Sequence, residues 1–182
     1  MGVEIERRFL IDGRGEKPWR LDYEGKRELF QCYLSNIVIE NNSVLWNGVE
    51  LISGDKDFSE IKTWRLRRES DLVWLTAKGK KIGASATEYE WEIPIALFES
   101  LEGVSDLPFI QKTRWLWRGE DGLLWEIDEF SSKLYGLIIA EVELESEDQE
   151  IIIPSWAGIE LTHMEGWSNA SLAILAKDIK MN

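Results

Sequence analysis

The chain has 182 residues, of which 30% are charged and 44% are hydrophobic, and its formal net charge is −13 at pH 7. This length predicts a single domain, residues 1–182, with a substantial core. The acidity argues against duplex nucleic acid and anionic membranes as partners, because proteins that bind these polyanions carry basic surfaces. No apolar run is long enough to span a membrane, the first residues are acidic, and Cys32 is the single cysteine. We therefore expect a soluble, cytoplasmic protein without an intrachain disulfide.

Strand patterns follow one another along most of the chain. Residues 3–11 form the first predicted strand, and a charged, glycine-containing loop at 13–25 leads to a second strand at 28–35. Alternation is weak between 36 and 62, where Asn47-Gly48 predicts one hairpin. The later predicted strands are 63–68, 72–78, 88–93, 109–118, 123–130 and 137–145. We expect one helix between Pro94 and Gly103 and another at 170–179, capped by Ser168 or Asn169. The pattern is typical of a mainly β, α+β domain with an antiparallel sheet.

Charges stand at alternate positions in many of these strands, with largely apolar residues between them. Residues two apart in a strand point to the same face of the sheet. The pattern therefore predicts a sheet curled around a charged interior, with its apolar face covered from outside. Several of the ten tryptophans, such as Trp64, Trp91 and Trp115, fall in the apolar phase and are expected to pack there. The alternating charges are Glu4, Glu6 and Arg8; Arg65 and Arg67; Lys78 and Lys80; Glu88, Glu90 and Glu92; Lys112 and Arg114; Glu126 and Asp128; and Glu141, Glu143 and Glu145.

Like-signed carboxylates in such an interior need a counter-charge. Internal salt bridges are one solution, and a cation between the carboxylates is the other. The single histidine and the single cysteine exclude the usual zinc and copper ligand sets, so oxygen ligands for Mg²⁺ or Mn²⁺ remain. The neighbouring arginines and lysines suit phosphate oxygens. Together these features indicate phosphoryl transfer or phosphate hydrolysis, and the absence of a Gly-x-x-x-x-Gly-Lys loop excludes a P-loop enzyme.

Short motifs occur in the order of a known family. Glu4-Ile5-Glu6-Arg7-Arg8 resembles the E-x-E-x-K signature of the CYTH superfamily, the triphosphate tunnel metalloenzymes. Three further motifs resemble its Q-G-Y-L, R-x-R and L-T-x-K-G segments: Gln31-Cys32-Tyr33-Leu34, Arg65-Leu66-Arg67 and Leu75-Thr76-Ala77-Lys78-Gly79. The resemblance runs through essentially the whole chain. It implies a closed antiparallel eight-stranded β-barrel, a tunnel with a charged lumen and flanking helices, which binds a triphosphate and a divalent metal.

The resemblance also implies a role for each charged residue. Glu90, with Glu88 as its alternative, and Asp128 would position a second metal and the attacking water. Arg8 stands where the signature has lysine, which keeps the charge but changes the shape of the group. The metal ligands would be Glu4, Glu6, Glu88, Glu141 and Glu143; the triphosphate ligands Arg65, Arg67, Lys78, Lys112 and Arg114; and the catalytic residues Glu90, Asp128 and Arg8.

These inferences lead to one main function and two alternatives. The main hypothesis is metal-dependent hydrolysis of a small triphosphate, with inorganic tripolyphosphate ahead of nucleoside or thiamine triphosphates. The first alternative is class IV adenylate cyclase activity, which relatives perform in the same tunnel. The second is a catalytically weak triphosphate- or nucleotide-binding module, which Arg8 and a thinner set of bases would favour. A homodimer and the role of residues 36–62 remain open.

Overall fold

The computed structural model describes residues 5–54, 56–79 and 87–179. Its main sheet has eight strands in the order β1-β11-β10-β9-β2-β6-β7-β8, and every neighbouring pair is antiparallel. The strands are β1 (Ile5–Leu10), β2 (Gly25–Leu34), β6 (Ile61–Glu69), β7 (Leu72–Gly79), β8 (Glu88–Ile93), β9 (Phe109–Arg118), β10 (Leu124–Phe130) and β11 (Ile138–Leu144). The predicted mainly β, eight-stranded antiparallel sheet is confirmed.

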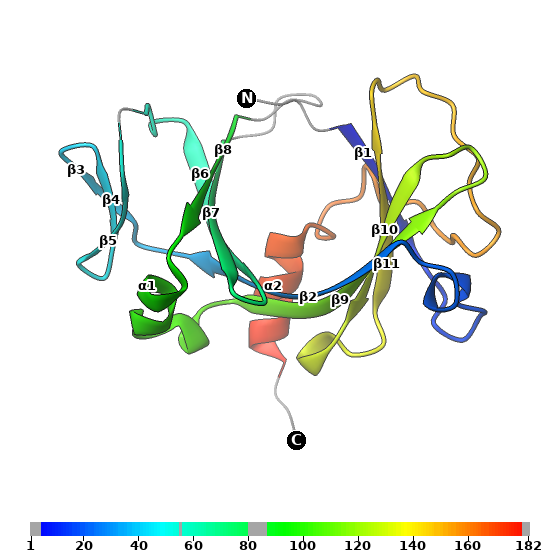
Figure 1. Cartoon of the computed structure of the whole chain (residues 1–182), viewed down its shortest axis with the longest axis horizontal. Coiled ribbons are helices and arrows are strands. Elements are labelled where there is room, and N and C mark those ends of the chain that lie inside the picture. Colours follow the sequence, from blue (N-terminus) through cyan, green and yellow to red (C-terminus); the bar gives the residue numbers. More distant parts are fainter. Residues whose placement is uncertain (1–4, 55, 80–86, 180–182) are drawn as a thin grey trace.

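The sheet curls into a deep U with β1 and β8 at its two edges (Figure 1). Part of the outer edge of β1 is taken by the segment 158–162. The backbone N–H of Leu10 donates to Ile159, 2.8 Å, and Leu161 donates to the carbonyl of Arg8, 2.7 Å. Arg7 and Glu160 add an ion pair of 2.7 Å. Within the described ranges no ladder joins β1 to β8, so the structure shows a strongly curved sheet, and the closure into a barrel stays a prediction.

The outer, convex face of the sheet is apolar and covered, as the sequence predicted. A second sheet of β3 (Val38–Glu40), β4 (Ser43–Trp46) and β5 (Val49–Ser53) covers one half, together with helix α1 (Ile95–Ser100). Trp64 and Trp91 stack there with ring centroids 6.4 Å apart. Trp19 and Trp156 pack over Trp125 on the other half. The tryptophans are thus core residues that hold the covering segments against the sheet.

The inner, concave face is divided into two zones. At one end Leu10, Ile110, Phe130 and Ile139 form an apolar cluster with Leu172 and Ala173 of helix α2 (Asn169–Asp178). On each of these strands, the residue two positions from the apolar cluster is charged: Arg8, Lys112, Asp128 and Glu141. Because residues two apart share a face, α2 packs at the end of the charged zone. The side chain of Ser168 caps α2 by accepting from the N–H of Ser171, 3.1 Å, which confirms the predicted cap.

The segment 36–53 contains one more hairpin than the sequence predicted. Asn47 and Gly48 join β4 to β5 with φ values of 49° and 79°, as a type I′ turn requires. Asn41 and Asn42 join β3 to β4 with φ values of 48° and 64°. Helix α1 stops before Gly103, because Leu101 is already extended. Among the described residues no helix is long and apolar enough to cross a membrane.

Candidate active site

The charged zone of the concave face encloses a cavity of about 530 Å³. This volume lies within the ordinary range for small-ligand sites, roughly 300–1,000 Å³. Nearly all the site residues predicted from the sequence line it: Glu6, Arg8, Arg65, Arg67, Lys78, Glu88, Glu90, Lys112, Arg114, Glu141 and Glu143. Asp128 is not among the lining residues, and Glu4 lies outside the described residues.

Carboxylates form one wall of the cavity, on β1, β11 and β10. Glu6 is the cross-strand partner of Glu143, and Glu126 is the partner of Glu141. Like charges placed directly opposite one another in a sheet are destabilising. Burial raises the pKa of Glu126; Arg114 opposes this shift, and the nearby carboxylates of Asp128, Glu141 and Glu143 add to it. Arg114 pairs with Glu126 and Glu141, and Arg8 pairs with Glu141, so these arginines offset part of the repulsion. A bound cation would offset more of it.

The donor chemistry of this wall fits a hard divalent cation, because carboxylate oxygens are the ligands that Mg²⁺ and Mn²⁺ accept. In the part of the chain that the structure describes, no three Asp, Glu, His or Cys side chains converge on one point. Magnesium commonly takes only one or two protein carboxylates and completes its shell with water and substrate phosphates. The facing pair of Glu6 and Glu143 meets that requirement.

Asp128 lies behind the cavity rather than in it. Its side chain is 1% exposed, and its two oxygens accept hydrogen bonds from Nε and Nη2 of Arg114, each 2.7 Å. The ammonium of Lys112 binds the same carboxylate. Burial disfavours the charged acid, but Arg114 and Lys112 outweigh it and hold the pKa of Asp128 below its usual range. The carboxylate of Asp128 therefore holds Lys112 and Arg114 in place, and its predicted role in positioning water stays a prediction.

Arginines form the opposite wall. Arg65 donates from Nη2 to the hydroxyl of Thr76, 3.0 Å, and Arg67 donates from Nη2 to Glu90, 3.2 Å. The guanidinium of Arg67 lies 5.1 Å from the ring centre of Trp74. Burial, reinforced by the charge of Arg65, lowers the pKa of Arg67. The Nε atoms of both arginines are buried without a hydrogen-bond partner. Buried donors of this kind need an acceptor, and a phosphate oxygen is the acceptor that arginine suits best.

Arg8 connects the carboxylate wall with α2. Its Nε lies 2.9 Å from Oε1 of Glu141, and its Nη1 donates to the carbonyl of Trp167, 2.7 Å. Trp167 immediately precedes Ser168, the cap of α2. The buried Nη2 has no hydrogen-bond partner. Arg8, which stands in place of the signature lysine, thus connects the carboxylate wall to the start of α2. Its Nη2 remains without an acceptor.

Several lining residues were not among the site residues predicted from the sequence. They are Gln31, Tyr33, Thr63, Glu126, Ser168 and Asn169. Gln31 donates to the hydroxyl of Tyr33, 3.0 Å, and burial raises the pKa of Tyr33 to about 12. The period-two pattern of β2 could have identified these two, because they lie on the same face of the sheet as Lys112 and Arg114. Ser168 and Asn169 had no such signal, since only the packing of α2 brings them to the cavity.

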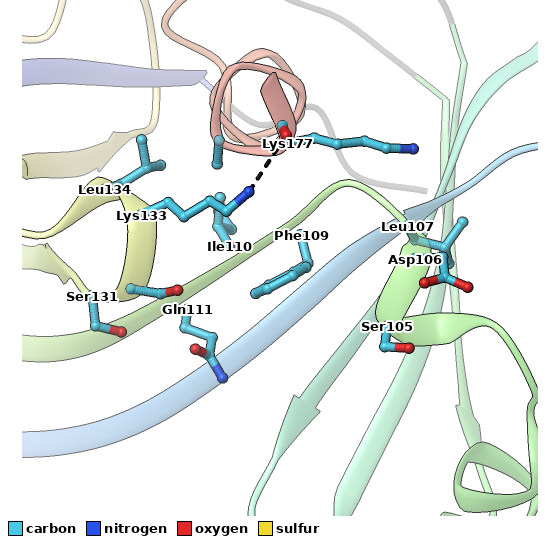
Figure 2. A pocket seen from close by; sticks show the side chains of 12 residues that line it. Ser105, Asp106, Leu107, Phe109, Ile110, Gln111, Ser131, Lys133, Leu134 and Lys177 are labelled. Carbon is cyan, nitrogen blue, oxygen red and sulfur yellow. Dashed lines mark hydrogen bonds between the residues drawn. The ribbon is translucent and has the colours of Figure 1, made fainter. Parts of the chain in front are cut away.

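A second cavity, of about 230 Å³, lies near the C-terminal end of α2 (Figure 2). Its walls include Leu107, Ile110 and Leu134, and Lys133 donates across it to the carbonyl of Lys177, 3.4 Å. It is smaller than most ligand sites. None of the predicted site residues lines it, so the concave cavity is the better candidate.

Comparisons with known proteins agree with this choice. The CYTH domain family matches residues 3–173. An inorganic triphosphatase of Acetivibrio thermocellus is 34% identical over 173 residues, which is 94% of this chain and 94% of that protein. An inorganic triphosphatase of Nitrosomonas europaea is 37% identical over 112 residues, 60% of this chain and 74% of that protein. The crystal structure of the inorganic triphosphatase NE1496 is similar with a TM-score of 0.63, at 30% identity over 96% of each chain.

Proposed function

The chain belongs to the CYTH domain family, and we propose that it is an inorganic triphosphatase that hydrolyses tripolyphosphate in the concave cavity. The observation that carries this proposal is that an arginine wall and a carboxylate wall face each other across one cavity. Buried arginine donors without acceptors lie on one side, and facing carboxylates lie on the other. A triphosphate with its divalent cation would satisfy both. The two related inorganic triphosphatases support the same activity.

The arginines would bind the phosphate chain and stabilise its transition state. In hydrolysis a water oxygen forms a bond to the terminal phosphorus while the bridging P–O bond breaks, which gives orthophosphate and pyrophosphate. Negative charge spreads over the phosphoryl oxygens in this step. The guanidinium groups of Arg65, Arg67 and Arg8, which line the cavity, would donate to those oxygens. Lys112 and Arg114, held in place by Asp128, add fixed positive charge without reorganisation.

Glu90 would orient the attacking water. Its carboxylate lines the cavity beside the arginines, and its Oε1 accepts from Arg67 and from the hydroxyl of Thr76. A carboxylate fixed in this way can accept a hydrogen bond from water and receive its proton as the water attacks. We assign this role to Glu90 because both Arg67 and Thr76 donate to its carboxylate and fix its orientation.

The cation would be Mg²⁺ or Mn²⁺, held first by the facing pair Glu6 and Glu143. Glu4 and Glu141, the other ligands expected on this side, would join the set when the ion and the substrate bind. When bound, such an ion would neutralise phosphate charge and lower the pKa of a coordinated water. Glu88 would complete the set on the arginine side. The oxygen-only donors and the mutual repulsion of the facing carboxylates support this proposal.

We extend the proposal to the architecture of the whole chain. Residues 1–182 would act as one domain, and β1 and β8 would approach one another to close the U into a tunnel around the substrate. The partner would be a small triphosphate, with no role for nucleic acid or membranes, and a homodimer is compatible with this arrangement. The free thiol of Cys32 is buried, and burial raises its pKa to about 12; an unpaired cysteine supports a location in the reducing cytoplasm.

The test is a substrate panel with the purified protein. Release of orthophosphate and of pyrophosphate would be measured from tripolyphosphate and ATP, and release of orthophosphate from pyrophosphate, each with Mg²⁺, with Mn²⁺ and with a chelator. We expect metal-dependent release from tripolyphosphate that Glu143→Gln abolishes and Glu147→Gln, an exposed control, preserves. Pyrophosphate release from ATP alone would indicate a cyclase. Binding of tripolyphosphate without release would indicate a binding module.

A further inference from the structure

Three residues form a hydrogen-bonded row across the arginine wall of the cavity. Thr76 on β7 is the cross-strand partner of Arg65 on β6 and of Glu90 on β8. All three side chains lie on the concave face, but Thr76 is fully buried and does not line the cavity. Its hydroxyl accepts from Nη2 of Arg65, 3.0 Å, and donates to Oε1 of Glu90, 2.9 Å.

The hydroxyl bridges two groups that do not hydrogen-bond to each other directly. Nη2 of Arg65 and Oε1 of Glu90 are 3.7 Å apart, which is too long for a hydrogen bond. A hydroxyl has one proton to donate, and Glu90 takes it, so its lone pairs face Arg65. The direction of the hydrogen bonds is therefore fixed: Arg65 donates to Thr76, and Thr76 donates to Glu90. Each bond also limits the rotation of a longer side chain.

We propose that Thr76 is a positioning residue for triphosphate hydrolysis, which sets the orientation of both Arg65 and Glu90. This inference rests on the proposed function. With Nη2 engaged by Thr76, the guanidinium of Arg65 is held in one orientation in the lining of the cavity, where it would meet a phosphate oxygen. With Oε1 engaged by Thr76 and Arg67, Glu90 is held at one angle toward the cavity. Correct alignment of the phosphorus and its attacking water depends on both groups.

The test replaces only the hydroxyl. Thr76→Val keeps the shape of the side chain and removes both hydrogen bonds, whereas Thr76→Ser keeps them. Because a misplacement of about 1 Å can cost roughly 100-fold in rate, we expect Thr76→Val to lower kcat for tripolyphosphate by about 10- to 100-fold. The Michaelis constant should rise less than kcat falls, and Thr76→Ser should stay within a few-fold of wild type.

Thr113→Val is the matched control. Thr113 is also a strand threonine whose hydroxyl contacts a carboxylate, that of Glu28 at 2.9 Å, but it lies on the outer face. Its replacement should leave kcat unchanged. The melting temperatures of all variants separate lost positioning from lost folding. In a Glu90→Gln background, Thr76→Val should add a smaller loss than in wild type, because one of the two groups that Thr76 orients is already disabled while Arg65 still depends on it.

The outcomes distinguish the two levels of the proposal. An active wild type with Thr76→Val at full kcat, or with Thr76→Ser as impaired as Thr76→Val, would overturn the positioning role and leave the triphosphatase intact. A wild type that binds tripolyphosphate without hydrolysis would overturn the proposed function. In that case the role of Thr76 is decided by titration calorimetry. Weaker binding by Thr76→Val than by Thr76→Ser supports it, and equal binding overturns it.

Discussion

Nη1 of Arg8 donates a 2.7 Å hydrogen bond to the backbone carbonyl of Trp167, the residue before the cap of α2. The same guanidinium lies 2.9 Å from Glu141 in the carboxylate wall. One side chain therefore ties the strand that begins the sheet to the helix at the end of the cavity. A lysine, as the family signature has it, could offer a single ammonium to these two acceptors.

The first prediction concerns this link. Arg8→Lys should retain the charge opposite Glu141 but weaken the bond to Trp167, because an ammonium lacks the planar fork of a guanidinium. A hydrogen bond to a charged group contributes about 1.5–3 kcal/mol, so the free energy of unfolding should fall by about this amount. Denaturant unfolding and the protease sensitivity of α2 would measure it. Unchanged stability would show that Arg8 acts in this chain as a charge alone.

The second prediction concerns the buried carboxylate of Asp128. Asp128→Asn would leave Lys112 and Arg114 buried without their shared counter-charge. Breaking a buried ion pair from one side costs about 3–5 kcal/mol. Because the folded pKa of Asp128 is lowered, its stabilisation is complete above the unfolded pKa, near 4, and is lost as the pH falls through the folded value.

The difference in unfolding free energy between Asp128→Asn and wild type should therefore be largest at neutral pH and shrink in acid. Asp12→Asn, which disrupts the exposed ion pair with Arg14, is the control and should change stability little. Equal stability of Asp128→Asn and wild type at pH 7 would contradict the role assigned to this carboxylate.

The third prediction concerns Glu126, whose pKa shift and effect on stability are opposite in sign to those of Asp128. The folded pKa of Glu126 is raised, first by burial and then by its carboxylate neighbours against the pull of Arg114. Its ionised form therefore costs stability above the folded pKa, and this cost disappears below the unfolded value, near 4.3. In a chelator, Glu126→Gln should melt above wild type at pH 8, and the two curves should converge in acid. A lower melting temperature at pH 8 would show that the ion pair with Arg114 dominates.

The fourth prediction concerns the cation. Mg²⁺ or Mn²⁺ should raise the melting temperature, because a ligand that binds only the folded state stabilises it, by about 2.7 kcal/mol at 100 times its dissociation constant. Glu143→Gln should remove most of this increase and Glu147→Gln should preserve it. If neither ion changes the melting temperature, or if the increase in Glu143→Gln equals that in wild type, the carboxylate wall is excluded as the metal site.

Most of the fold and much of the site were predictable because charged and apolar residues alternate in parts of the strands. They alternate in residues 64–67 of β6 and 140–144 of β11, so Arg65, Arg67, Glu141 and Glu143 could be assigned to one face. Alternation assigns a side chain to one face of the sheet but does not show whether that side chain reaches the cavity. It could not show that Arg114 covers Asp128, because this depends on the side chains of the neighbouring strand.

Two further features do not follow from the period-two pattern. The approach of Ser168 and Asn169 to the cavity depends on α2 packing against Leu10, Ile110 and Ile139, residues far apart in sequence. The hairpin at Asn41 and Asn42 follows from two asparagines in the left-handed region, where a β-turn can use asparagine in place of glycine. Each depends on contacts or backbone angles that period-two alternation does not encode.

The central claim is that the concave face, and not the sheet in general, binds and hydrolyses a triphosphate. The most direct measurement is kcat/KM for tripolyphosphate in Arg67→Gln and Arg68→Gln. These adjacent residues of β6 lie on opposite faces: Arg67 lines the cavity, and Arg68 contacts the carbonyl of Ser70 outside it. Because removal of one preorganised donor costs about 100- to 1,000-fold in rate, Arg67→Gln should lose about that much and Arg68→Gln less than about two-fold. Equal effects of the two substitutions, or an inactive wild type, would contradict the account.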